Sequence, residues 1–241
     1  PEIAPSSGMS TFYFRYMVPS VMDGSNEVPG VIDVVWGLSP VDDPTAYGDY
    51  APLGRQEFNQ SIDIYDTDTY VEILETLPGG VWYEMWWVVD TDNRTVDVHI
   101  KGGDTYATQT QIADDHGWRN QTIEAIDVFL LTTSAGTLLE PKGLDAMLFD
   151  DIYLDTAGEN LASPLGGAGW ALVDDFEGYA DQAALDMIWT QDMDPDGENG
   201  GGSLGDDPME AGNTVLDLAM GATTAETGTY NVRFYRSFPE I

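Results

Sequence analysis

The acidic loop at residues 192–199 carries the clearest pattern for a chemical site. Its carboxylates alternate as Asp192-x-Asp194-x-Asp196, and Gly197 follows directly. Alternating side-chain oxygens can converge on one hard cation, and glycine permits the sharp turn that such a loop needs. We therefore predict that this loop binds Ca²⁺.

The loop departs from an EF-hand in two ways. The twelfth position, where an EF-hand has glutamate, is Ser203, and Pro195 is unusual inside such a loop. The prediction is a looser calcium loop, to which Asp206, Asp207 and Glu210 can add oxygens. The alternative is a solvated acidic loop, as in proteins adapted to salt water.

Aromatic side chains beside a carboxylate form a second candidate site, because sugar rings stack on aromatic faces while polar groups orient the sugar. Trp82, Glu84 and Trp86 alternate along one run and should share one face of a strand. Trp118 lies in a polar, loop-like segment and is expected to be the most exposed, and Tyr65 is a further candidate. The alternative is that these rings belong to the core or to an interface.

Catalytic patterns are weak, and we predict that the chain is not an enzyme. His99 and His116 lie in separate segments, and no G-x-S-x-G motif is present. A glycosidase needs a pair of carboxylates, and the run around Glu84 offers only that one on its outward face. Convergence of Arg15, His99 and Tyr235, as in a polysaccharide lyase, is the remaining alternative.

Composition limits the partners. The 241 residues include 43 Asp and Glu against 8 Lys and Arg, for a formal net charge of −35. Such a chain repels nucleic acid and anionic membranes and favours cations or saline surroundings. Cysteine is absent, which excludes disulfides and thiolate zinc sites, and no apolar run is long enough to span a membrane.

Period-two alternation indicates about ten strands, separated by Gly, Pro, Asn and Asp. The clearest hairpin joins 81–89 to 95–100, with Val81, Tyr83, Met85, Trp87 and Val89 on the core face of its first strand. One short helix is predicted at Asp181–Trp189, capped by Asp181 and buried through Ala184, Leu185 and Ile188. The fold class is therefore all-β, an antiparallel β-sandwich of the jelly-roll type with one short helix.

The two ends of the chain share a tripeptide. It begins Pro1-Glu2-Ile3 and ends Pro239-Glu240-Ile241. Joined, the ends would form a hairpin between the aromatic strands 230–238 and 11–18. We therefore expect a repeat from a tandem array, cut out of phase with its own sandwich and completed by strands of neighbouring copies. The alternative is a single-copy domain with a chance match.

Three segments resemble a known family. FDDIYLD at 149–155, VDDFEGY at 173–179 and the hairpin WYEMWWVVDTDNRTVDVHI at 82–100 are similar to concanavalin A-like (laminin-G-like) jelly-roll modules of bacterial surface and secreted proteins. In this interpretation 1–155 is the main body with the closing strands, 156–169 is a linker, and 170–241 opens the same or the next module.

The resemblance implies a structural calcium ion between the opening and closing strands. The matching positions are Asp150, Asp151, Asp174, Asp175 and Glu177. It also implies an extracellular or cell-surface protein. The leading functional interpretation is a non-catalytic structural repeat of a fibre, sheath or adhesin stalk that binds other copies head to tail. The alternative is a carbohydrate-binding module of a secreted, polysaccharide-active protein.

Overall fold

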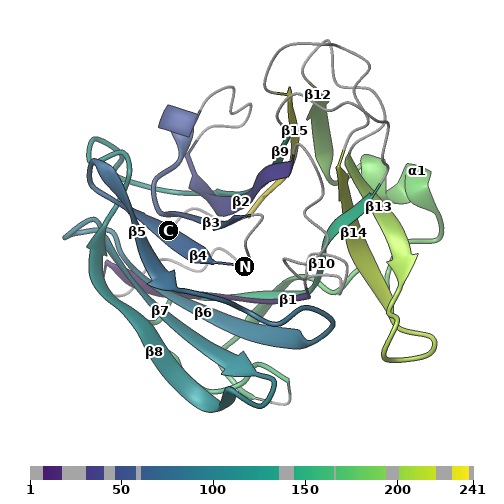
Figure 1. Ribbon diagram of the computed structural model, residues 1–241, viewed down its shortest axis with the longest axis horizontal. Coiled ribbons are helices and arrows are strands. Elements are labelled where there is room, and N and C mark those ends of the chain that lie inside the picture. The colour runs from purple at the N-terminus through teal and green to yellow at the C-terminus, as the bar shows by residue number, and fades with distance from the viewer. Residues whose placement is uncertain are drawn as a thin grey trace.

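The computed structural model describes residues 8–17, 31–40, 47–57, 61–135, 144–165, 167–193, 201–220 and 230–238. Their strands form two stacked sheets (Figure 1). Sheet A contains, in order, β13 (Gly201–Asp206), β14 (Thr214–Met220), β10 (Leu144–Asp155), β1 (Met9–Met17), β6 (Trp82–Asp90), β7 (Thr95–Gly102) and β8 (Tyr106–Gly117), with β11 (Ala171–Asp174) paired to β10. Sheet B contains, in order, β12 (Thr190–Met193), β15 (Tyr230–Ser237), β9 (Val128–Ala135), β2 (Val31–Ser39), β3 (Leu53–Glu57), β4 (Ile62–Asp66) and β5 (Thr69–Leu74).

The chain crosses repeatedly between the sheets. It runs from β1 in sheet A to β2–β5 in sheet B, returns for β6–β8, and crosses again for β9. Every strand pairing among the described residues is antiparallel. These findings confirm the predicted antiparallel β-sandwich.

The core lies between the sheets and follows the predicted alternation. On β1, Phe12, Phe14 and Tyr16 belong to one buried cluster that also contains Tyr83 and Trp87 of β6. Alternate side chains of a strand point to opposite faces, so Tyr13 and the residues that alternate with it lie on the outer face of sheet A. The predicted core face of the first hairpin strand, β6, is therefore confirmed, and β1 divides into two faces in the same way.

The helix is shorter than predicted. α1 spans Gln182–Asp186, and the Asp181 side chain caps it by accepting a hydrogen bond from the Ala184 amide at 3.0 Å. Leu185 is buried as expected, but Ile188 is 49% exposed because it lies beyond the end of the helix. Among the described residues, no helix is long and apolar enough to cross a membrane.

The predicted hairpin between the first and last strands is wrong. β1 pairs with β6 and β10 in sheet A, whereas β15 pairs with β9 and β12 in sheet B. Both edges of each strand are therefore occupied within the chain. Phe12 and Phe238 still meet across the core, with ring centroids 5.5 Å apart. The matching tripeptides at 1–3 and 239–241 lie outside the described residues.

The predicted opening and closing strands lie in one sandwich. β11 pairs directly with β10, in register Ile152 with Asp174. The segment between them packs on the outer face of sheet A, where the Trp86 indole donates to the carbonyl of Ala162 at 3.2 Å. We call residues 156–170 the covering segment. Its described residues therefore cover part of the sheet.

Candidate functional site

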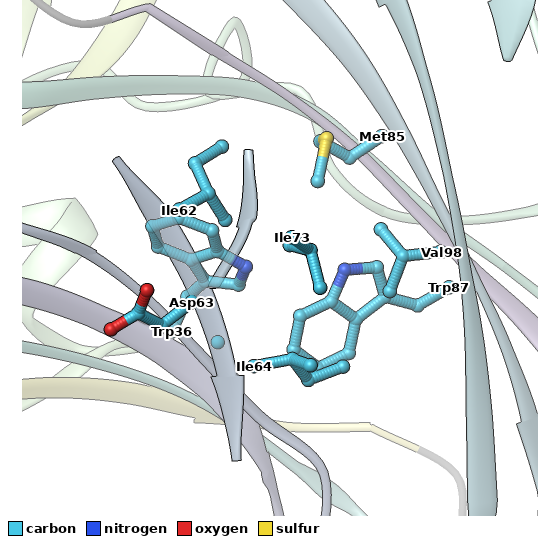
Figure 2. Close-up of a pocket in the computed structure, with 9 residues that line it drawn as sticks. Trp36, Ile62, Asp63, Ile64, Ile73, Met85, Trp87 and Val98 are labelled. Atoms are coloured by element: carbon cyan, nitrogen blue, oxygen red, sulfur yellow. The ribbon is translucent and has the colours of Figure 1, made fainter. Parts of the chain in front are cut away.

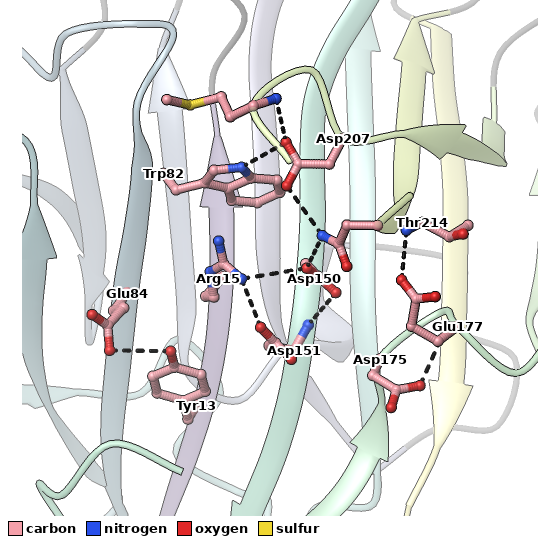
Figure 3. Close-up of polar contacts among 12 residues, drawn as sticks. Tyr13, Arg15, Trp82, Glu84, Asp150, Asp151, Asp175, Glu177, Asp207 and Thr214 are labelled. Atoms are coloured by element: carbon pink, nitrogen blue, oxygen red, sulfur yellow. Dashed lines mark hydrogen bonds and ion pairs between the residues drawn. The ribbon is translucent and has the colours of Figure 1, made fainter. Parts of the chain in front are cut away.

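Polar side chains form a row across four adjacent strands on the outer face of sheet A. The register aligns Lys101 of β7 with Glu84 of β6, Glu84 with Arg15 of β1, and Arg15 with Asp150 of β10. With neighbouring strands about 4.8 Å apart, the row is roughly 14 Å long. Figure 3 shows three of its strands side by side. The name polar strip is used below for Tyr13, Arg15, Glu84, Lys101, Asp150 and Asp151.

A β-bulge places two successive aspartates on this face. The register of β10 against β1 shifts between Tyr13 and Arg15, and Asp151 has φ 51°. Aspartate tolerates this left-handed conformation better than most residues, and a bulge aims an extra side chain at the same face. The Asp150 carboxylate also accepts a hydrogen bond from the Asp151 amide at 2.8 Å. The bulge is therefore what makes an acidic pair here.

Two ion pairs run along the strip. The Arg15 guanidinium lies 2.8 Å from Asp151 and 3.5 Å from Asp150, and Lys101 Nζ lies 2.6 Å from Glu84. The Tyr13 hydroxyl donates to the second oxygen of Glu84 at 3.2 Å. Burial of Tyr13, together with the negative charge of Glu84, raises the pKa of that phenol, so it stays a hydrogen-bond donor.

Exposure differs along the strip. The side chains of Lys101, Glu84, Arg15 and Asp151 are 41, 18, 17 and 13% exposed, respectively. The Asp150 side chain is only 3% exposed. Burial raises the pKa of Asp150 to about 7, and the charge of Asp151 adds to this, while hydrogen bonds and Arg15 act against it. Asp150 is therefore a buried support, and the other four groups reach solvent.

Trp82 borders the strip on one side, two residues before Glu84 along β6. The Arg15 guanidinium lies over its ring, 4.8 Å from the centroid, and the indole N–H donates to Asp207 at 3.1 Å. Burial favours a raised pKa for Asp207, but hydrogen bonds from the Met209 amide, Asn213 and Trp82 outweigh it and lower the pKa. Asn213 also donates to Asp150 at 3.0 Å, so one network fixes both the ring and the strip (Figure 3).

The covering segment closes the opposite side of the strip. Thr11 on β1 donates to the carbonyl of Gly158, and Gln109 on β8 donates to that of Leu161. Trp86 lies beneath this segment and is 1% exposed, with Tyr13 packed against it at a centroid distance of 5.1 Å. Trp86 is therefore on the predicted face, but its ring is not open to a ligand.

Two other predicted aromatic ligands lie elsewhere. Trp118 was expected to be the most exposed ring, but it is completely buried and donates its indole N–H to the carbonyl of Thr95 at 2.9 Å. That expectation is wrong, because the segment before it is strand β8 rather than a loop. Tyr65 lies on β4 of sheet B, with Arg119 over its ring at 4.1 Å. Of the five predicted ligand residues, Trp82 and Glu84 lie together at the open part of the strip.

The predicted calcium ligands do not converge as a set. Asp174 is buried and accepts hydrogen bonds from Tyr179, Trp189 and the Phe176 amide, besides an ion pair with Arg236. Its oxygens are thus occupied by donors from this chain. Asp150 and Asp151 are likewise paired with an arginine.

The remaining predicted metal ligands make local contacts or lie outside the description. Asp175 accepts from the Glu177 amide, and Glu177 accepts from the Thr214 amide at 2.6 Å. Within the described part of the chain, no group of three or more His, Cys, Asp or Glu side chains is placed to hold a metal ion. The Asp192 side chain and residues 194 and 196 are outside the described set. Calcium binding by that loop stays a prediction.

A small space between the sheets is part of the core. Trp36, Trp87, Met85 and Ile73 line it, and both indole nitrogens face it (Figure 2). Neither indole N–H has a hydrogen-bond partner in the described structure. The space does not admit a water molecule, and it is therefore no ligand site.

Sequence reasoning missed half of the strip. Arg15 was considered for convergence with His99 and Tyr235, but not for the same row as Glu84 and Asp151. The signal was present in the alternation of each strand, and the missing information was the register that aligns them. Lys101 was missed as well, although it directly follows the predicted hairpin strand.

No protein-family model matches the sequence, and no curated protein is similar to it. Several solved structures are distantly similar in fold. A GH131 β-glucanase catalytic domain from Podospora anserina aligns with a TM-score of 0.44 and 12% identity over 68% of this chain. The present chain spans 64% of that protein's length.

Two further structures are a lectin-like protein and a lectin by their descriptions. Arcelin-5, a lectin-like defence protein from Phaseolus vulgaris, aligns with a TM-score of 0.33 and 9% identity, over 95% of this chain and 70% of its own. The lectin UEA-II, solved in complex with galactose, aligns with a TM-score of 0.30 and 9% identity, over 95% and 72% of the two chains. A likeness this distant does not show what this chain binds or whether it catalyses a reaction.

Proposed function

We propose that this chain is a carbohydrate-binding module that holds a polysaccharide on the open part of the polar strip. The observation that supports this proposal is the row of partly exposed Glu84, Arg15 and Asp151 beside the Trp82 ring. Sugar hydroxyls can bridge carboxylates and guanidinium groups, and a ring edge can pack on an aromatic side chain. An extracellular location belongs to the same proposal.

The strip is prepared for such a ligand before it binds. Each exposed charge is held in place by a neighbour: Arg15 by Asp151, and Glu84 by Tyr13 and Lys101. A site whose side chains are already fixed loses less conformational entropy on binding. The carboxylate oxygens still have acceptor capacity, because each can accept more than one hydrogen bond.

The charge balance of the strip favours a neutral polysaccharide. Two cations face Glu84 and Asp151, while burial keeps Asp150 partly protonated near neutral pH. The strip is therefore close to neutral in a chain of net charge −35. A polyanionic glycan would be repelled by the rest of the surface.

Binding without hydrolysis is the preferred form of the proposal. A glycosidase needs a protonated carboxyl that reaches the glycosidic oxygen. Asp150 has the raised pKa, but it is 3% exposed and is bonded to Arg15 and Asn213. It cannot reach a bound sugar without breaking these contacts. The fibre interpretation has less support, since the hairpin on which it depended is absent.

The test is affinity electrophoresis and calorimetry on neutral soluble polysaccharides, including a β-glucan, a xylan and a galactomannan. We expect the intact chain to be retained by at least one, and Glu84→Gln and Trp82→Ala to weaken that retention about tenfold or more. Tyr70→Ala, on the outer face of sheet B, is the matched aromatic control and should bind normally. A reducing-end assay on the same glycan should show no hydrolysis.

Retention of none of these glycans by the folded wild-type chain would contradict the proposal. Equal losses in Glu84→Gln and Tyr70→Ala would show that binding does not use the strip. Glu84→Gln keeps the shape of the side chain, so its effect is separable from any unfolding caused by Trp82→Ala.

A further inference from the structure

Strand β8 presents an unpaired sheet edge. It is the last strand of sheet A, and within the described ranges it pairs only with β7. Figure 1 shows it as the outermost strand of its sheet. An exposed edge offers a row of backbone N–H and C=O groups to which another strand can add.

The central stretch of the edge lacks charged residues and prolines, two features that normally block such addition. The register of β8 against β7 shifts at three places, and such bulges are the protection that this edge does have. Residues 105–113, Thr-Tyr-Ala-Thr-Gln-Thr-Gln-Ile-Ala, contain no charge and no proline, and Asp104 and Asp114 flank them. Natural edges are protected by lysines, prolines or inward-pointing charges. In a chain of net charge −35, a second, equally acidic chain meets little local repulsion at this neutral stretch.

The neutral stretch of the edge is also complementary to itself. In antiparallel pairing centred on Gln109, Thr108 would face Thr110 of a second copy, and Tyr106 would face Ile112. Outside this stretch, Asp104 would face Asp114 at each end and oppose the pairing. Thr–Thr and aromatic–β-branched pairs are among the favourable cross-strand pairs. Tyr106 and Ile112 already pack against the core of their own sandwich, so this pairing would bring two cores together edge to edge.

We propose that β8 pairs with β8 of a second copy of this chain, antiparallel and about a two-fold axis at Gln109. The contact is isologous and closed, so it yields a dimer instead of a fibre. With the axis perpendicular to the sheet, both polar strips lie on the same face of the joined sheet. If the proposed function holds, the dimer presents two glycan sites to one polymer, which raises its avidity.

The dimer is weak and depends on salt. One strand pair of nine residues buries less than the roughly 1,200 Å² of a stable interface, so concentration controls the dimer fraction. Two acidic chains repel one another, and salt screens that repulsion. We therefore expect the dimer to strengthen as NaCl rises, whereas an interface built on ion pairs would weaken.

Sedimentation velocity across protein and NaCl concentrations gives the first test. Thr108 and Thr110 are exposed, and Thr108→Glu/Thr110→Glu places glutamate opposite glutamate twice in the proposed register. This variant should be monomeric under conditions in which the wild type dimerises. Thr108→Glu/Thr110→Lys places glutamate opposite lysine and should restore the dimer. A wild type that is monomeric throughout, or two double variants that behave alike, would overturn the proposal.

Cysteine cross-linking tests the register, because the chain has no cysteine of its own. Gln109→Cys would face itself at a Cα distance of about 4.5–5.5 Å, within disulfide range. Ala107→Cys, on the same face of β8, would face Gln111 and should not cross-link. Equal cross-linking at both positions, or none at 109 in a dimer, contradicts the two-fold pairing. The Glu/Glu variant keeps the whole strip, so normal glycan binding by it separates the two proposals.

Discussion

The outer faces of the two sheets carry similar residue types in different arrangements. On sheet B, Val35, Leu53 and Leu130 are buried together with Tyr50, whose hydroxyl lies 2.6 Å from that of Thr132. On sheet A, the equivalent face carries the polar strip, where charged side chains of four strands reach solvent. The first face combines this apolar group with a smaller charged group, Arg55, Glu57 and Asp63, whereas the second carries a charged row across four strands.

The arginines show the difference most clearly. On sheet B, Arg55 lies 3.6 Å over the ring of Tyr70 and donates two hydrogen bonds to Asp63. On sheet A, Arg15 lies over Trp82 but faces two carboxylates, one of them buried. Arg55 also pairs with a second carboxylate, Glu57, which is 27% exposed. The two acids at Arg15 are more deeply buried than those at Arg55, which costs stability, and such costs are commonly found where a surface binds a ligand.

The largest expected effect comes from removing the central cation of the strip. Arg15→Met leaves Asp150 and Asp151 without their partner, which should cost about 3 kcal/mol of unfolding free energy near pH 8. Arg55→Met on sheet B should cost less, about 1 kcal/mol, because its acidic partners Asp63 and Glu57 are 9 and 27% exposed, against 3 and 13% for Asp150 and Asp151. Urea unfolding of both variants measures this. A larger loss for Arg55→Met would reverse the comparison.

The next effect is a pH dependence that belongs to sheet A alone. Burial raises the pKa of Asp150 to about 7, against about 3.9 in an unfolded chain. The folded state therefore binds a proton more tightly than the unfolded state does. The resulting contribution to the free energy of unfolding is complete below about pH 4 and is lost as pH rises through 7. Asp150→Asn has no carboxylate to ionise in the core, so it should be more stable than the wild type at pH 8 by on the order of 2 kcal/mol.

The matched control is Asp63→Asn on sheet B, which removes an ion-pair partner of Arg55 and should destabilise at the same pH. Thermal unfolding between pH 4 and 8 distinguishes the two variants. If Asp150→Asn were less stable than the wild type at pH 8, the attraction between Arg15 and ionised Asp150 would outweigh the cost of burying that charge. Asp150 would then stabilise sheet A through its ion pair, as Asp63 does on sheet B.

The fold could be predicted where alternation was strong. Phe12, Phe14 and Tyr16 alternate with polar residues, and the runs containing β1, β6 and β7 were found with their faces correct. β8 was missed because an edge strand is partly solvated, and its Thr and Gln residues do not alternate with apolar residues. β3 was missed because Gly54 and Gln56 stand on its core side, where apolar residues are expected.

The site was harder to predict because it depends on register. Glu84 was identified, but its neighbours come from strands far away in sequence, and one residue of slip would turn Arg15 away from it. The bulge at Asp151 has no sequence signature beyond two successive acids. Burial of Trp86 depends on the covering segment, whose Gly- and Ser-containing sequence was interpreted as a free linker.

A smaller effect separates the aromatic residues of the two faces. Tyr65→Ala removes the ring that lies beneath Arg119 and beside Tyr70 on sheet B, at a cost of about 1 kcal/mol. The affinity of the Tyr65→Ala variant for a polysaccharide should equal that of the wild type, because Tyr65 is on the opposite side of the sandwich from Trp82. A loss of affinity comparable to that of Trp82→Ala would move the binding site to sheet B.

The smallest expected effect concerns calcium at the strip. Arg15 lies against Asp150 and Asp151, so a calcium ion there would have to displace a bonded guanidinium. Adding Ca²⁺ to chelator-treated protein should therefore shift the melting temperature of Asp151→Asn and of the wild type equally. Any shift should instead disappear in Asp192→Asn/Asp196→Asn, where the sequence predicts a loop for the ion. If the Ca²⁺-induced shift in melting temperature disappeared in Asp151→Asn alone, the ion would be bound at the strip, because only an ion held by the Asp151 carboxylate would be lost with that carboxylate.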